Sequence, residues 1–134
     1  MCSSDLIAIE PEAAALAARE ANPAAVAEIR FGYERMEAAE ASGEDNLDAD
    51  IAFHIAVLNA SANPFYMQFR DVVATALRTS IRFTNRFKGR TASLPAHQAV
   101  LAAIEAGDGG TARHAMAAII AEVMAMIEDA ERGS

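Results

Sequence analysis

The stretch Asp50-Ile51-Ala52-Phe53-His54-Ile55-Ala56-Val57-Leu58-Asn59-Ala60-Ser61-Ala62-Asn63-Pro64-Phe65 decides how the rest of the chain is organised. An α-helix turns once in about 3.6 residues, so Asp50 and His54, four apart, project from the same face. The residues around this pair are mostly apolar, which indicates a helix that is buried on much of its circumference. Because a buried carboxylate or imidazole needs a partner, the rest of the chain must supply hydrogen bonds, or the pair must hold a metal ion.

The composition is that of packed helices in one domain over 1–134. The chain is 53% hydrophobic and 6% aromatic, with no Trp, seven Gly and four Pro. This length suffices to bury a core without disulfides. Eleven Lys and Arg against nineteen Asp and Glu give a net charge of −8. That charge repels phosphate backbones and gives no support for binding of DNA or of an anionic membrane by this chain alone.

The sequence also predicts a cytoplasmic location. Cys2 is the only cysteine, so no internal disulfide can form and a reducing compartment is favoured. No run of about eighteen apolar residues predicts a membrane span, and no basic segment followed by an apolar core predicts a signal peptide. We therefore expect a soluble protein with no membrane partner.

Helical periodicity and turn residues predict an all-α fold, a bundle of about six helices with short connections. No stretch alternates with period two for long enough to make a strand. Asn22, Ser93 and Asp108 are expected to cap helices, and Asn63-Pro64 is expected to start another. The expected helices cover about 5–21, 23–41, 47–60, 64–87, 93–107 and 108–131.

Three histidines offer chemistry. His97 is followed by apolar residues at one and two turns and is expected to face the interior, whereas His114 lies off the apolar stripe of its helix and is expected to face solvent. Asp50, His54 and His97 together would be a set of two imidazoles and one carboxylate, which suits zinc, nickel, manganese or iron. Spacing supports only the first two, so spacing alone favours hydrogen-bonded core residues over a metal site.

Arginines recur along the expected helix 64–87. Long basic side chains on a helix face are usually solvated or paired with acids. Arg78 and Arg82 differ, because Leu77, Ile81 and Phe83 surround them in the sequence and an interior guanidinium needs an anion. A carboxylate ligand would supply that anion.

Four segments spread over nearly the whole chain form a recognisable series. They are Ile9-Glu10-Pro11-Glu12-Ala13-Ala14-Ala15-Leu16-Ala17-Ala18-Arg19, Asp50-Ile51-Ala52-Phe53-His54 with Ala60-Ser61-Ala62-Asn63-Pro64, His97-Gln98-Ala99-Val100-Leu101-Ala102-Ala103-Ile104-Glu105-Ala106-Gly107-Asp108, and Ala112-Arg113-His114-Ala115-Met116. In this order and at these separations, they resemble the FCD domain, the effector-binding C-terminal domain of FadR-type GntR transcription regulators.

The resemblance implies an antiparallel bundle of six or seven helices that forms a homodimer and holds a small-molecule pocket, behind a winged helix-turn-helix that binds DNA. This sequence lacks that DNA-binding domain, so we expect an isolated domain or a truncated regulator. Many members bind a divalent metal through an Asp and three His. Asp50, His54 and His97 match three of these positions, and Ile119 stands at the fourth. Three protein ligands can still hold zinc, nickel or manganese when water or effector oxygens fill the open positions.

The segment 76–85 resembles the branch of the family whose effectors are sugar acids. This resemblance predicts a small carboxylate or sugar-acid effector that pairs with Arg78 or Arg82. Its hydroxyls would reach Asn85 or the neighbouring Thr79 and Ser80.

Three functions are compatible with these residues. The favoured one is an effector-sensing and dimerisation module of a transcription regulator, without catalysis. A metalloenzyme is the second, since two His and one carboxylate with open positions also serve iron oxygenases and some hydrolases. A purely structural dimerisation bundle, in which Asp50 and His54 bond only to each other, is the third.

Overall fold

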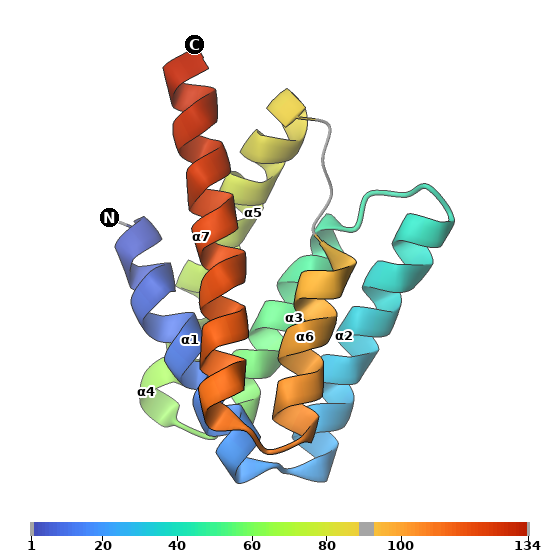
Figure 1. The fold of residues 1–134 in the computed structure, drawn as a ribbon, viewed down its shortest axis with the longest axis vertical. Coiled ribbons are helices and arrows are strands. Elements are labelled where there is room, and N and C mark those ends of the chain that lie inside the picture. Colours follow the sequence, from blue (N-terminus) through green and yellow to red (C-terminus); the bar gives the residue numbers. More distant parts are fainter. Residues whose placement is uncertain (1, 89–92, 134) are drawn as a thin grey trace.

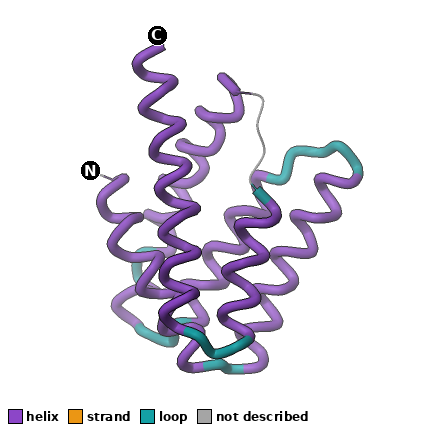
Figure 2. Tube along the Cα trace, in the orientation of Figure 1, coloured by secondary structure: helices purple, strands orange, loops and turns teal. Residues whose placement is uncertain are grey.

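The structure is a computed structural model that describes residues 2–88 and 93–133, with side chains described at 9–79, 93–122, 124 and 125. Within these residues the chain forms seven α-helices and no strand (Figures 1 and 2). The all-α prediction is confirmed, with seven described helices in place of about six. They are α1 Cys2–Glu20, α2 Pro23–Ala41, α3 Leu47–Ala60, α4 Pro64–Met67, α5 Arg70–Lys88, α6 Leu94–Glu105 and α7 Gly109–Gly133.

Short polar side chains begin the helices at the predicted places. Asn22 Oδ1 accepts the N–H of Ala25 at 3.0 Å before α2. Ser93 caps α6 in the same way, and Asp108 accepts the N–H of Thr111 at 3.1 Å at the start of α7. Such caps satisfy backbone donors that the first helical turn leaves without partners, so they fix where each helix begins.

The prediction of one helix over 64–87 is wrong, because the chain divides there into α4 and α5 at Gln68 and Phe69. The N–H of Phe69 bonds to the carbonyl of Tyr66 at 3.1 Å, three residues back instead of four. The rings of Phe65 and Phe69 also pack edge to face, with centroids 5.3 Å apart. A tightened turn with aromatic packing beside it therefore ends α4 after one turn.

The helix α3 lies at the centre of the packing. Ten of its fourteen residues are buried, which confirms the expectation from its apolar sequence. It packs against α1, α2 and α5, while α1 lies along α7 (Figure 1). The approach of α2 to α3 is close, because a Cβ added at Gly32 would lie 3.0 Å from the Cα of Phe53.

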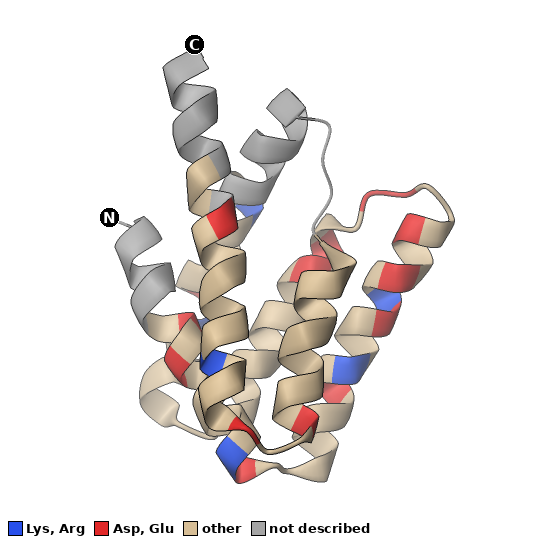
Figure 3. Cartoon of the chain, in the orientation of Figure 1, with Lys and Arg blue, Asp and Glu red and all other residues tan. Residues whose placement is uncertain are grey.

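Charged side chains join the outer parts of the bundle. The charged residues of α2 are all exposed and include both signs (Figure 3). Arg113 of α7 makes two hydrogen bonds to Glu12 of α1, at 2.8 and 3.1 Å, which tie these helices together.

None of the helices in the described part of the chain is both long and apolar enough to cross a lipid bilayer.

Candidate metal centre

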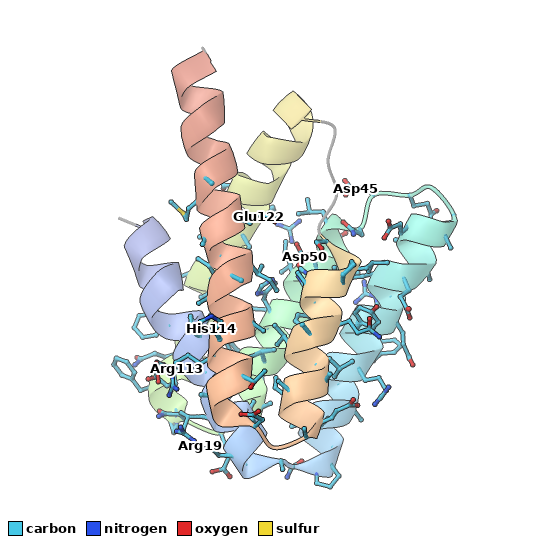
Figure 4. All side chains as sticks on the ribbon, in the orientation of Figure 1. Arg19, Asp45, Asp50, Arg113, His114 and Glu122 are labelled. Carbon is cyan, nitrogen blue, oxygen red and sulfur yellow. The ribbon has the colours of Figure 1, made fainter. Side chains whose placement is uncertain are left out.

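Asp50, His54 and His97 meet in the interior, between α3 and α6 (Asp50 is labelled in Figure 4). Asp50 Oδ1 lies 2.8 Å from Nε2 of His97 and 3.1 Å from Nε2 of His54. The two Nε2 atoms are 3.3 Å apart. Bonds of about 2.0–2.2 Å around a tetrahedral metal ion place neighbouring ligand atoms about 3.3–3.6 Å apart. The triangle of donor atoms is therefore close to the size that a divalent ion requires.

The other ring nitrogen of each histidine is already engaged. His97 Nδ1 lies 2.7 Å from the carbonyl oxygen of Ser93, one turn earlier at the start of α6. His54 Nδ1 bonds to Oε1 of Glu10, which comes from α1. With a metal ion in the triangle, the oxygen partner at Nδ1 takes the ring N–H of each histidine, and the lone pair of Nε2 is left for the ion. This arrangement fits metal binding, because metal-ligating histidines usually donate their second N–H to a carboxylate or carbonyl.

Glu10 is a site residue that the sequence-based prediction missed. Its side chain is completely buried, and its Oε2 has no hydrogen-bond partner among the described residues. Together with Asp50 it places two negative charges in the core, and two neutral imidazoles do not balance them. A divalent cation would balance both charges, whereas a single proton on His54 balances only one. The donor set therefore fits a divalent ion.

The carboxylates also set the protonation of the site when no ion is bound. Burial alone lowers the pKa of His54, but the charge of Glu10, the hydrogen bonds that His54 donates to Asp50 and Glu10, and the charge of Asp50 outweigh burial and raise this pKa to about 10. Burial raises the pKa of Asp50, but hydrogen bonds from His54 and His97 hold that pKa well below its usual range. Without metal, the raised pKa favours the protonated form of His54, between Glu10 and Asp50.

An aromatic side chain packs against both histidines of the trio. The ring of Phe53 packs edge to face on His97, with centroids 4.9 Å apart, and on His54 at 5.7 Å. Ile119, at the position where the resemblance implies a fourth ligand, is buried in α7. His114 is exposed on the same helix, as expected, and stands apart from the trio (Figure 4).

The predicted ligand contacts on α5 do not join this centre in the described residues. Arg78 is not interior, contrary to expectation: its side chain is 46% exposed and bonds to Asp48 at 3.1 Å. It lines an open surface groove of about 590 Å³ between α2, α3 and α5. The buried stripe of α5 runs through Val73 and Leu77, which leaves the next position, 78, on the outer side. The side chains of Arg82 and Asn85 lie outside the described residues.

The chain belongs to the FCD domain family, which matches residues 6–122. This confirms the resemblance to the effector-binding domains of GntR-type transcription regulators, and it supports an effector-binding, regulatory role.

One relative agrees with this assignment, and one solved structure agrees with the fold. The chain is 31% identical over 121 residues to "HTH-type transcriptional regulator LutR" of Bacillus subtilis (strain 168), a match that covers 86% of this chain and 55% of LutR. Its fold is similar to that of Streptococcus agalactiae GntR, with a TM-score of 0.69 and 21% identity over 97% of this chain and 58% of that chain. The chain thus spans a little over half the length of each of these proteins.

Proposed function

We propose that this domain senses a small organic acid through a divalent metal ion held by Asp50, His54 and His97. The observation that carries the proposal is the different surroundings of the two nitrogen atoms in each imidazole ring. Both Nδ1 atoms have oxygen partners, and both Nε2 atoms converge on Asp50 Oδ1 within 3.1 Å. The metal would be zinc, nickel or manganese, which accept nitrogen and carboxylate ligands together.

The chain's own residues hold the ion and leave room for an effector. Two imidazoles and one carboxylate are fewer ligands than these metals accept, so open positions remain for oxygen atoms of an acid. When bound, the ion supplies an electrophilic centre that attracts a carboxylate and a neighbouring hydroxyl. Ile119 places an apolar side chain in α7 where the family pattern has a fourth histidine, which leaves one more position for the effector.

The site also joins helices that are far apart in the sequence. Glu10 belongs to α1, Asp50 and His54 to α3, and His97 to α6. An effector that favours one spacing of these helices over another shifts the population of that state. We propose that the domain forms a homodimer, and that a DNA-binding domain preceding it in a full-length regulator responds to this shift. Such a regulator acts in the cytoplasm, where its DNA is.

The contacts on α5 remain part of this proposal. Arg82 and Asn85 are predicted to bind the carboxylate and hydroxyls of a sugar-acid effector. Arg78 differs from the predicted interior effector contact, because its guanidinium lies at the surface and is already paired with Asp48.

Two other functions are weighed against this one. A metalloenzyme with two His and one carboxylate would use the same trio, but the relative LutR is named as a transcriptional regulator, so we infer that the domain is not an enzyme. Conversion of a candidate acid by the metal-loaded protein would reverse that inference. In a purely structural bundle, the same side chains would only bond to one another and would take up no metal.

The test is metal titration of His97→Ala, with His114→Ala as the matched control. His97 supplies one corner of the donor triangle, whereas His114 is exposed and distant from it. We expect His97→Ala to lose most of its affinity for Zn²⁺ while it keeps its helical circular dichroism, and His114→Ala to bind as the parent does. Equal affinities in all three proteins would remove His97 from the site and refute the proposal.

A further inference from the structure

Asn46 is a buried amide whose side chain has no hydrogen-bond partner among the described residues. It is 1% exposed, and neither Oδ1 nor Nδ2 has a hydrogen-bond partner among the described residues. It occupies the N-cap position of α3, where an Asn side chain normally accepts a backbone N–H, but it makes no such bond. Asp45 performs that role instead, accepting the N–H of Leu47 at 2.9 Å. The described part of the chain therefore gives this buried side chain no hydrogen-bonding role.

A buried carboxamide without partners opposes folding, since it has given up its hydrogen bonds to water. Such groups are rare in native proteins, and each one calls for a specific reason. One reason is that a ligand completes the hydrogen bonds. The second buried group with an unpartnered atom in the described residues is Glu10, which is already part of the metal centre.

Asn46 lies next to the metal centre along α3. Asn46, Asp50 and His54 follow one another at intervals of four, so they share one side of the helix. The N–H of Asp50 bonds to the carbonyl of Asn46 at 2.9 Å, which places the two residues one helical turn apart. A turn rises by about 5.4 Å, a distance that the carbon chain of a small acid spans.

We propose that Asn46 is a specificity-determining residue that binds hydroxyl groups of the effector beyond the atoms that reach the metal. This inference rests on the proposed function of the trio. A carboxamide offers one acceptor oxygen and two donor hydrogens, so it matches a hydroxyl that both donates and accepts. A site built to bond a hydroxyl discriminates strongly against the analogue that lacks it. The effector class is then a polyhydroxy acid.

The experiment compares acids that share the group expected to bind the metal and differ in the hydroxyl groups on the rest of the carbon chain. Tartrate and malate share a 2-hydroxycarboxylate, as do gluconate and 2-hydroxyhexanoate, but only the first of each pair carries additional hydroxyls. Binding of all four is measured on the Zn²⁺-loaded parent, on Asn46→Leu and on Asn59→Leu. Asn59 is an exposed asparagine on the same helix, so it is a matched control.

We expect the parent and Asn59→Leu to prefer the more hydroxylated acid of at least one pair by about tenfold or more. In Asn46→Leu this preference should fall below about threefold. A preference that survives in Asn46→Leu, or no preference in the parent, would overturn the assignment of Asn46. Uptake of Zn²⁺, Ni²⁺ and Mn²⁺ is measured first on each protein, and a parent that takes up none of these metals overturns the proposed function as well.

A second measurement, made without any effector acid, distinguishes a ligand-binding role of Asn46 from a structural role. Thermal melting is recorded on the metal-free proteins. If the amide is unpartnered, Leu removes its desolvation cost and Asn46→Leu melts at a higher temperature than the parent. If the amide instead bonds within the fold, Asn46→Leu melts at a lower temperature, and the inference is wrong.

Discussion

Asp50→Asn changes the carboxylate whose Oδ1 lies close to both imidazoles of the metal centre. The substitution keeps the size of the side chain but removes the negative charge from the corner that lies 2.8 and 3.1 Å from the two imidazole nitrogens. An amide is a much poorer metal ligand than a carboxylate. The buried charges of Glu10 and a divalent ion would also no longer balance once Asp50 is neutral.

The expected loss exceeds what a residue outside the coordination shell contributes. Removing a hydrogen-bond partner of a metal ligand typically weakens metal binding by about 10–100-fold. Asp50 is itself a ligand in this account, so we expect a loss of at least about 100-fold, or about 2.7 kcal/mol. The matched control is Asp48→Asn, two residues earlier on α3, whose side chain is 76% exposed and pairs with Arg78 at the surface.

The assay is competition for Zn²⁺ against a chromophoric chelator, with circular dichroism to show that each variant is folded. Asp48→Asn should bind Zn²⁺ as the parent does. A folded Asp50→Asn whose affinity lies within about tenfold of the parent would refute the assignment of Asp50 as a ligand, because a partner outside the shell would explain so small a loss.

Two further predictions concern protonation and the missing fourth ligand. In EDTA-treated protein, the raised pKa of His54 stabilises the fold fully below its unfolded value of 6.5, and this stability is lost as pH rises toward about 10, so the melting temperature should fall across that window. Glu10→Gln removes a charge that raises this pKa, so the fall should be smaller and should end at lower pH; identical profiles for the two proteins would contradict the pairing of Glu10 with His54. Ile119→His should tighten Zn²⁺ binding about tenfold or more if position 119 faces the ion, and an unchanged affinity would show that it does not.

Local patterns in the sequence were sufficient to predict most of the helices. Caps at Asn22, Ser93 and Asp108 lie where polar side chains precede apolar periodicity, and the structure confirms them. The break between α4 and α5 was missed because Gln68 and Phe69 are ordinary helical residues, and the turn depends on aromatic packing that spacing does not reveal.

The site was only partly predictable. Spacing places Asp50 and His54 on one face, but His97 is 43 residues beyond His54 and meets it only through the packing of α6 against the core. Glu10 carried a usable signal, since a charge within the apolar run of Ile9, Ala13 and Ala14 lies on a buried face.

Arg78 also carried such a signal. Val73, Ala76 and Leu77 define the buried face of α5, and position 78 lies outside that face. The expectation of an interior guanidinium was based on residues adjacent to Arg78 in the sequence. The residues that share its face of the helix, three or four positions away, are the ones that decide burial.

The most direct test of the central claim is the metal content of the purified protein. Mass spectrometry would be carried out before and after EDTA treatment, and again after incubation with Zn²⁺, Ni²⁺ or Mn²⁺, with a melting curve for each sample. We predict about one ion per chain and a lower melting temperature after chelation, because an ion that binds only the folded state stabilises it. A protein that takes up none of the three metals, and whose melting temperature is the same in every sample, would contradict the account.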